Sequence, residues 1–138
     1  MNIMNIGLSH ISIVLGCLLS GCATNPTHPL PTLADPSKAS EAVVMRGSLF
    51  YGSAVAANVT VDGYIVANLF TGKHVRLKLN PGEHSIGTTH GSQTLNLESN
   101  QKYYLLVNVG FAGGFTTHRI DEAEASKILA TSKEVILK

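Results

Sequence analysis

The fold is decided by the stretch Lys73-His74-Val75-Arg76-Leu77-Lys78-Leu79-Asn80-Pro81-Gly82. Its apolar side chains, Val75, Leu77 and Leu79, alternate with polar ones, and this period of two is typical of a strand with one buried face and one solvated face. The next three residues predict a type II turn, because proline presets φ and glycine accepts a positive φ. The stretch therefore predicts a β-strand that ends in a tight turn.

The same period recurs on both sides of this stretch. Val59 and Val61 alternate with polar residues, as do Leu95 and Leu97. Asp62-Gly63 follows Val61 directly and is a preferred pair for a two-residue hairpin turn. The chain therefore reads mainly as antiparallel strands.

Two runs are almost continuously apolar, Val43–Tyr51 and Tyr103–Val109. Strands of this kind are usually covered on both faces. We therefore expect both runs to form central strands.

The C-terminal part predicts one helix. Asp121 can cap it, with Glu124 three residues later as in a capping box, and an apolar stripe follows at Ala125, Ile128 and Leu129. A short strand over Glu134–Leu137 should return to a sheet edge. The predicted fold is a mostly-β, small antiparallel β-sandwich of about seven strands with one C-terminal helix, over residues 41–138.

Composition excludes several classes of protein. The chain has 138 residues, 44% of them hydrophobic and 14% charged, with a net charge of +1. This is too apolar for a disordered chain. Because no run of like charge exists, we expect no nucleic-acid partner.

The N-terminal segment has the pattern of an export signal. The apolar run Ile11–Leu19 is too short to span a bilayer as a helix, and Ser20-Gly21-Cys22 follows it. Leu19-Ser20-Gly21-Cys22 resembles the lipobox of bacterial lipoproteins. That resemblance implies that residues 1–21 are a lipoprotein signal peptide, and that Cys22 is the lipid attachment site, with palmitate among its acyl chains. The alternative is a buried apolar helix that ends in a free cysteine.

The resemblance also implies a location. Ala23, rather than Asp, follows the cysteine, and in bacterial lipoproteins this implies the outer membrane, with the domain facing the periplasm. Stable lipid anchoring requires more than one acyl chain. We expect the membrane to be a partner through this lipid anchor.

Residues 22–40 form a proline-rich tether. Four of the five prolines of the chain are here, Pro26, Pro29, Pro31 and Pro36, and proline disfavours both helix and central strand. Two alternatives remain open. The segment is either a spacer that holds the domain away from the membrane, or a leader that lies on the domain surface.

Three motifs carry a further family resemblance: Val61-Asp62-Gly63, Leu77–Ile86 with its Pro81-Gly82-Glu83-His84 turn, and Lys102-Tyr103-Tyr104-Leu105. They resemble small bacterial lipoproteins of unknown function that have a PEGA-like or prealbumin-like β-sandwich. The resemblance covers roughly residues 43–137. It implies a fold and assigns no catalytic residue.

Few residues suggest chemistry. His74, His84 and His90 come from successive predicted strands, so a three-histidine metal site is conceivable, although none of the usual close ligand spacings is present. No nucleophile motif occurs. We therefore predict no enzymatic activity and no cofactor.

The glycine-rich Gly110–Thr117 stretch is the most unusual part of the domain. It either displays Phe111 and Phe115 to a partner, or folds these rings back over the end of the sandwich.

The sequence favours a membrane-anchored, non-enzymatic module that binds a protein or an envelope polymer. The alternatives are a small-ligand or metal-binding periplasmic module, and an accessory lipoprotein of a secretion or conjugation assembly.

Overall fold

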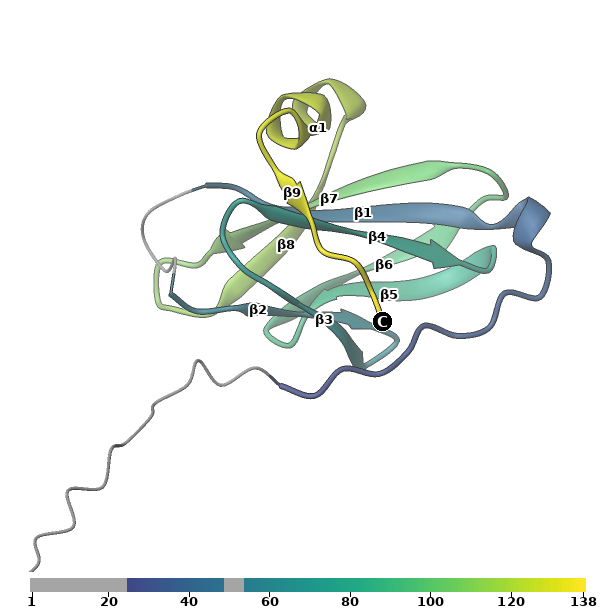
Figure 1. Ribbon diagram of the computed structural model, residues 1–138, viewed down its shortest axis with the longest axis horizontal. Helices are drawn as coiled ribbons and strands as arrows, with labels where there is room; N and C mark the ends of the chain where they lie inside the picture. Colours follow the sequence, from purple (N-terminus) through teal and green to yellow (C-terminus); the bar gives the residue numbers. More distant parts are fainter. Residues whose placement is uncertain (1–24, 49–53) are drawn as a thin grey trace, which may run out of the picture.

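Two β-sheets face each other in the computed structural model, which describes residues 25–48 and 54–138 (Figure 1). One sheet has the order β8-β7-β1-β4-β9 and the other β3-β2-β5-β6. The strands are β1 (Ser40–Arg46), β2 (Ala57–Val61), β3 (Tyr64–Leu69), β4 (Lys73–Leu79), β5 (Gly82–Thr88), β6 (Gly91–Leu97), β7 (Lys102–Val109), β8 (Phe115–Ile120) and β9 (Lys133–Glu134). A 3₁₀ turn, Pro36–Lys38, precedes β1, and helix α1 spans Glu122–Leu129. The predicted mostly-β sandwich with one helix near the C-terminus is confirmed.

The alternating residues of β4 divide between the two faces of its sheet. Val75, Leu77 and Leu79 are buried between the sheets, with at most 1% of each residue exposed. A fully buried side chain of this size contributes roughly 1.5–3 kcal/mol to stability. The hydrophobic contribution of β4 therefore comes from the three apolar positions that define its pattern.

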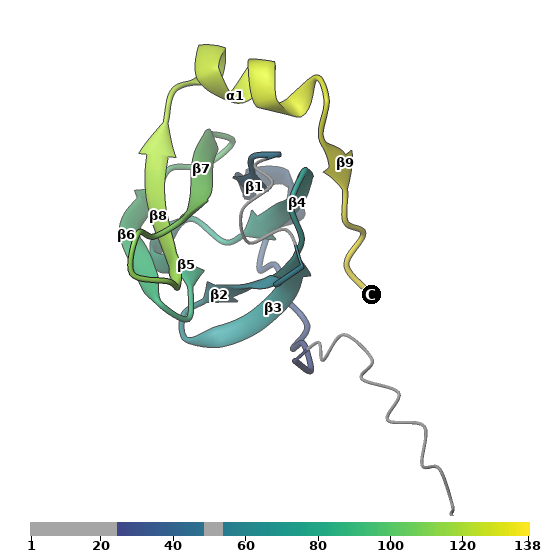
Figure 2. The same ribbon diagram turned by 90° about the vertical axis from the view of Figure 1, so that its left-hand side faces the viewer.

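The outer face of the five-stranded sheet has its own small core. Helix α1 lies across this face (Figure 2). Its members are Val43, Met45, Leu106, Ile120 and Ala125, with Tyr104, Ile128 and Leu129 packed against them. Strand β1 is therefore covered on both sides, as its apolar run predicts, and it is the middle strand of its sheet.

The turns follow the predicted chemistry. Asp62 and Gly63 have φ values of 50° and 87°, so the β2–β3 hairpin has two positive-φ residues as a type I′ turn requires. Gly82 has a φ of 124°. At the start of α1, Asp121 accepts a hydrogen bond from the Glu124 amide at 2.8 Å. The predicted helix cap is confirmed.

Three details differ from the predicted sandwich. The described residues contain nine strands rather than about seven. Two of the pairings, β1 with β7 and β4 with β9, are parallel. The parallel β9 has a simple cause: α1 carries the chain back over the outer face, so β9 starts at the same end as β4.

The last strand is also shorter than predicted. Only Lys133–Glu134 pairs with β4, whereas Glu134–Leu137 was expected. After Val135 donates to the His74 carbonyl oxygen at 2.8 Å, Val135 and Leu137 pack against the inter-sheet core. Burial of these side chains diverts the chain from the ladder.

The strand registers place the connections at two opposite ends of the sandwich. The β1–β2, β3–β4, β5–β6 and β7–β8 connections share one end, which we call the Phe111 end. The β2–β3, β4–β5 and β6–β7 connections share the other, which we call the Asp62 end. Figure 1 shows the Phe111 end on the left.

Candidate functional site

The predicted lipid attachment site, Cys22, and the predicted signal peptide lie outside the described residues. The description begins at Asn25, whose carbonyl oxygen accepts a hydrogen bond from the Asn68 side chain at 2.8 Å. Asn68 is next to the last residue of β3, which ends at the Phe111 end. The chain therefore joins the sandwich at this end.

Residues 25–39, which we call the N-terminal strap, lie along the surface of the domain. The His28 amide donates to the Ile65 carbonyl oxygen of the edge strand β3 at 2.7 Å. Further along, Asn80 bonds the strap twice, accepting from the Ala34 amide at 2.7 Å and donating to the Thr32 carbonyl oxygen at 3.1 Å. For residues 25–39 the structure therefore agrees with the surface-lying alternative.

A groove separates the strap from the C-terminal residues. It has a volume of about 600 Å³, within the usual range for a binding site. Leu30 forms one side, Val135 and Leu137 form the other, and all three pack against the inter-sheet core. Ile136 stands beside them with 75% of its surface exposed. An exposed isoleucine beside a groove can anchor a partner.

A smaller hollow lies on the other side of the strap, with a volume of about 390 Å³. Tyr64, 62% exposed, meets His28 edge to face with ring centroids 5.4 Å apart. Pro29 and Pro31 line the same hollow. The strap thus presents two adjacent concave surfaces lined by aromatic, proline and aliphatic groups.

The three histidines of the conceivable metal site lie in separate places. His74 is on β4, where its Nδ1 is 2.9 Å from the Ser132 hydroxyl. His84 is on β5 near the Asp62 end, and His90 is in the β5–β6 connection, with its ring 6.0 Å from that of Phe115. Residues 25–48 and 54–138 contain no group of three His, Cys, Asp or Glu side chains that could hold a metal ion. The structure does not bring these three histidines together as a metal site.

His84 forms a pair that sequence spacing did not suggest. Its Nδ1 is 2.8 Å from Asp62 Oδ2 and its Nε2 is 2.8 Å from the Asn80 carbonyl oxygen. The Ser85 amide donates to the other Asp62 oxygen at 2.9 Å. Partial burial acts to raise the pKa of Asp62, but the bonds from His84 and Ser85 outweigh it and lower that pKa below 3.8. Since both ring nitrogens already contact oxygen atoms, this pair ties two turns together rather than presenting a free base.

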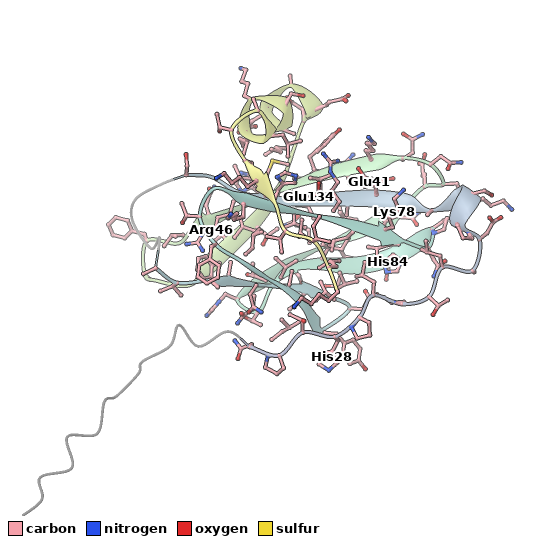
Figure 3. The ribbon with its side chains drawn as sticks, in the orientation of Figure 1. His28, Glu41, Arg46, Lys78, His84 and Glu134 are labelled. Atoms are coloured by element: carbon pink, nitrogen blue, oxygen red, sulfur yellow. The ribbon has the colours of Figure 1, made fainter. Side chains whose placement is uncertain are left out.

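Arg46 organises the Phe111 end from within. It is 2% exposed, and its Nη1 donates to the Leu69 carbonyl oxygen at 3.0 Å and to the Val55 carbonyl oxygen. Its guanidinium lies 4.6 Å from the centre of the Phe115 ring, within cation–π range. Burial lowers its pKa from the ordinary value of 12.5. Figure 3 places Arg46 near the Phe111 end and His84 farther toward the opposite end.

Sequence reasoning missed Arg46. The available signal was a lone arginine inside an otherwise apolar run, Val43–Tyr51. The two phenylalanines of the glycine-rich stretch divide the two alternatives between them: Phe115 is buried over the end of the sandwich, and Phe111 is fully exposed.

Comparisons with known proteins give little beyond the fold. No family model and no curated protein sequence matches the chain. Among solved structures, the chain is similar to the N-terminal domain of AlgF from P. aeruginosa, with 12% identity and a TM-score of 0.42. The match covers 63% of this chain and 99% of that domain. The resemblance to small bacterial lipoproteins therefore stays a prediction.

Hydropathy adds one observation about the described part of the chain. None of the helices there is long and apolar enough to cross a membrane.

Proposed function

We propose that this chain is a bacterial outer-membrane lipoprotein, held by lipid on Cys22, whose β-sandwich faces the periplasm as a non-catalytic binding module. The observation that carries the proposal is the sequence Leu19-Ser20-Gly21-Cys22 after an apolar run. The position of the described fold supports it, because cleavage before Cys22 would leave every described strand intact.

The groove beside the strap is the surface we assign to binding. It combines exposed backbone with aliphatic side chains from both ends of the chain. Exposed Ile136 and Tyr64 flank the strap on its two sides. A protein segment or an envelope polymer of similar length suits such a surface better than a small reacting substrate.

Labelling with radioactive palmitate tests the anchor. The wild-type chain should incorporate label and fractionate with outer membranes. Cys22→Ala should lose the label and the membrane association. Cys17→Ala is the matched control, because it removes the other cysteine of the chain from the segment that processing discards. Equal labelling of the Cys22→Ala and wild-type chains would refute the anchor.

Photo-crosslinking tests the groove. A crosslinking amino acid at position 136 should capture one discrete partner in intact cells. The same group at Lys127, exposed on α1, is the control. Identical products from both positions would show that the groove has no special partner.

A further inference from the structure

The inference concerns which end of the sandwich faces the membrane, and it rests on the proposed anchor at Cys22. Asn25, three residues after Cys22, lines a pocket of about 300 Å³ at the Phe111 end. The same pocket is lined by Val55, Phe70, His90 and Phe115. The first described residue is therefore built into this end of the molecule.

Chain geometry limits how far the anchor can lie from that pocket. A fully extended chain advances about 3.3–3.6 Å per residue, so the Cα atoms of Cys22 and Asn25 are at most about 11 Å apart. The strap cannot act as a long spacer, because residues 25–39 are bonded to the domain along their length. A lipid on Cys22 would therefore hold the Phe111 end close to the bilayer.

The chemistry of this end suits a lipid surface. Among the described residues of its four connections, 47–48 with 54–56, 70–72, 89–90 and 110–114, there is no Asp, Glu, Lys or Arg. Phe111 is fully exposed at the tip of the β7–β8 connection, and Val55 is 58% exposed. Burying such side chains at the headgroup boundary is favourable and desolvates no charge.

The charges around this end add to the argument. Lys73 and Lys133 lie opposite each other at the starts of β4 and β9, beside the Phe111 end. Cations at this position attract anionic lipid headgroups. The connections of the other end carry carboxylates instead, including Asp62 and Glu98. The molecule is therefore polarised along its strands.

We infer that the Phe111 end lies against the membrane, with Phe111 and Val55 in contact with lipid and the Asp62 end directed away from it. The contact need not be strong alone, because the anchor keeps this end at high effective concentration near the bilayer.

Tryptophan fluorescence tests this orientation, since the chain contains no tryptophan. The full lipidated chain with Phe111→Trp is reconstituted into vesicles of phosphatidylethanolamine and phosphatidylglycerol, with and without brominated acyl chains. Emission should fall about twofold or more in brominated vesicles if residue 111 reaches the acyl boundary. Tyr64→Trp, an exposed aromatic position at the Asp62 end, is the matched control and should not be quenched. Val55→Trp should repeat the result for Phe111→Trp.

Each other outcome counts against the inference. Equal emission from Phe111→Trp in both kinds of vesicle would overturn it. Quenching of Tyr64→Trp alone would mean that the opposite end faces lipid. Shielding of Phe111→Trp from aqueous iodide without quenching by bromine would mean that a second copy covers this end. Mass spectrometry of Cys22 in the same samples separates the two proposals. An unmodified thiol overturns both, whereas a lipidated but unquenched protein overturns only the orientation.

Discussion

Gly82 illustrates how one backbone position shapes this sandwich. Its φ of 124° lies in the region that side chains disfavour, while a Cβ built on it would meet no atom within 4 Å. The demand for glycine there is conformational and owes nothing to crowding. This separates two effects that usually occur together.

Gly82→Val should therefore destabilise the fold by about 1 kcal/mol or more, because a β-branched residue resists a positive φ. Gly47→Val is the matched control, since Gly47 has equally open space and no positive φ. Urea unfolding measures both variants. Equal midpoints would show that the β4–β5 turn tolerates a side chain.

Asp62 links local geometry to pH. Because its pKa in the folded state lies below its ordinary value of 3.8, its stabilising effect is complete above that pH. The effect is lost as pH falls through the lower folded-state pKa. Asp62→Asn should therefore lower the melting temperature at neutral pH, and the difference should shrink in strong acid.

A double-mutant cycle with His84→Gln identifies the cause of this effect. If the ion pair carries it, Asp62→Asn should cost less in the His84→Gln background than in the wild type. An unchanged cost would assign the effect to the Ser85 amide instead.

The attachment of α1 and β9 to the sheet depends on one buried histidine. His74 is 6% exposed and faces Ser132 on the connection after α1, Glu134 on β9 and Arg76 on its own strand. Burial, followed by the charge of Arg76, lowers the pKa of His74 below 6.5, while Glu134 acts in the opposite direction. The neutral ring is the form that fits this position.

Acidification should therefore loosen this attachment. Below pH 6.5 the unfolded chain binds the proton more readily than the folded chain, so stability falls as pH drops toward the folded-state pKa. Urea midpoints at about pH 7.5 and about pH 5.5 should differ less in His74→Gln than in the wild type. His118→Gln, on an exposed position of β8, controls for the loss of a histidine. An unchanged pH dependence in His74→Gln would show that another group is responsible.

The strap is part of the folded molecule as a whole, because it covers the edge of β3 and packs Leu30 against the inter-sheet core. Leu30→Asp should release it at a cost of about 1 kcal/mol, since this side chain is only partly buried. Thr27→Asp places the same charge at an exposed strap position and should leave the strap in place. Hydrogen exchange at the His28 amide measures the release. Equal protection in both variants would show that the hydrogen bonds alone hold the strap.

The elements of this fold could be read from local patterns. Alternation in β4, the Asp62-Gly63 turn and the Asp121 cap each depend on residues within a few positions of one another. The parallel β9 could not be read in this way, because it depends on where α1 delivers the chain. The same holds for the Asp62–His84 pair, whose members are 22 positions apart.

The anchor proposal and the strand pattern depend only on the order of residues, because processing signals, turns and amphipathic strands are short-range features. The shared position of the strap, the C-terminal residues and the Phe111 end was decided only by tertiary structure. It arises because the sheets must bury their inner faces together, and that packing carries residues from distant parts of the sequence to the same end of the molecule.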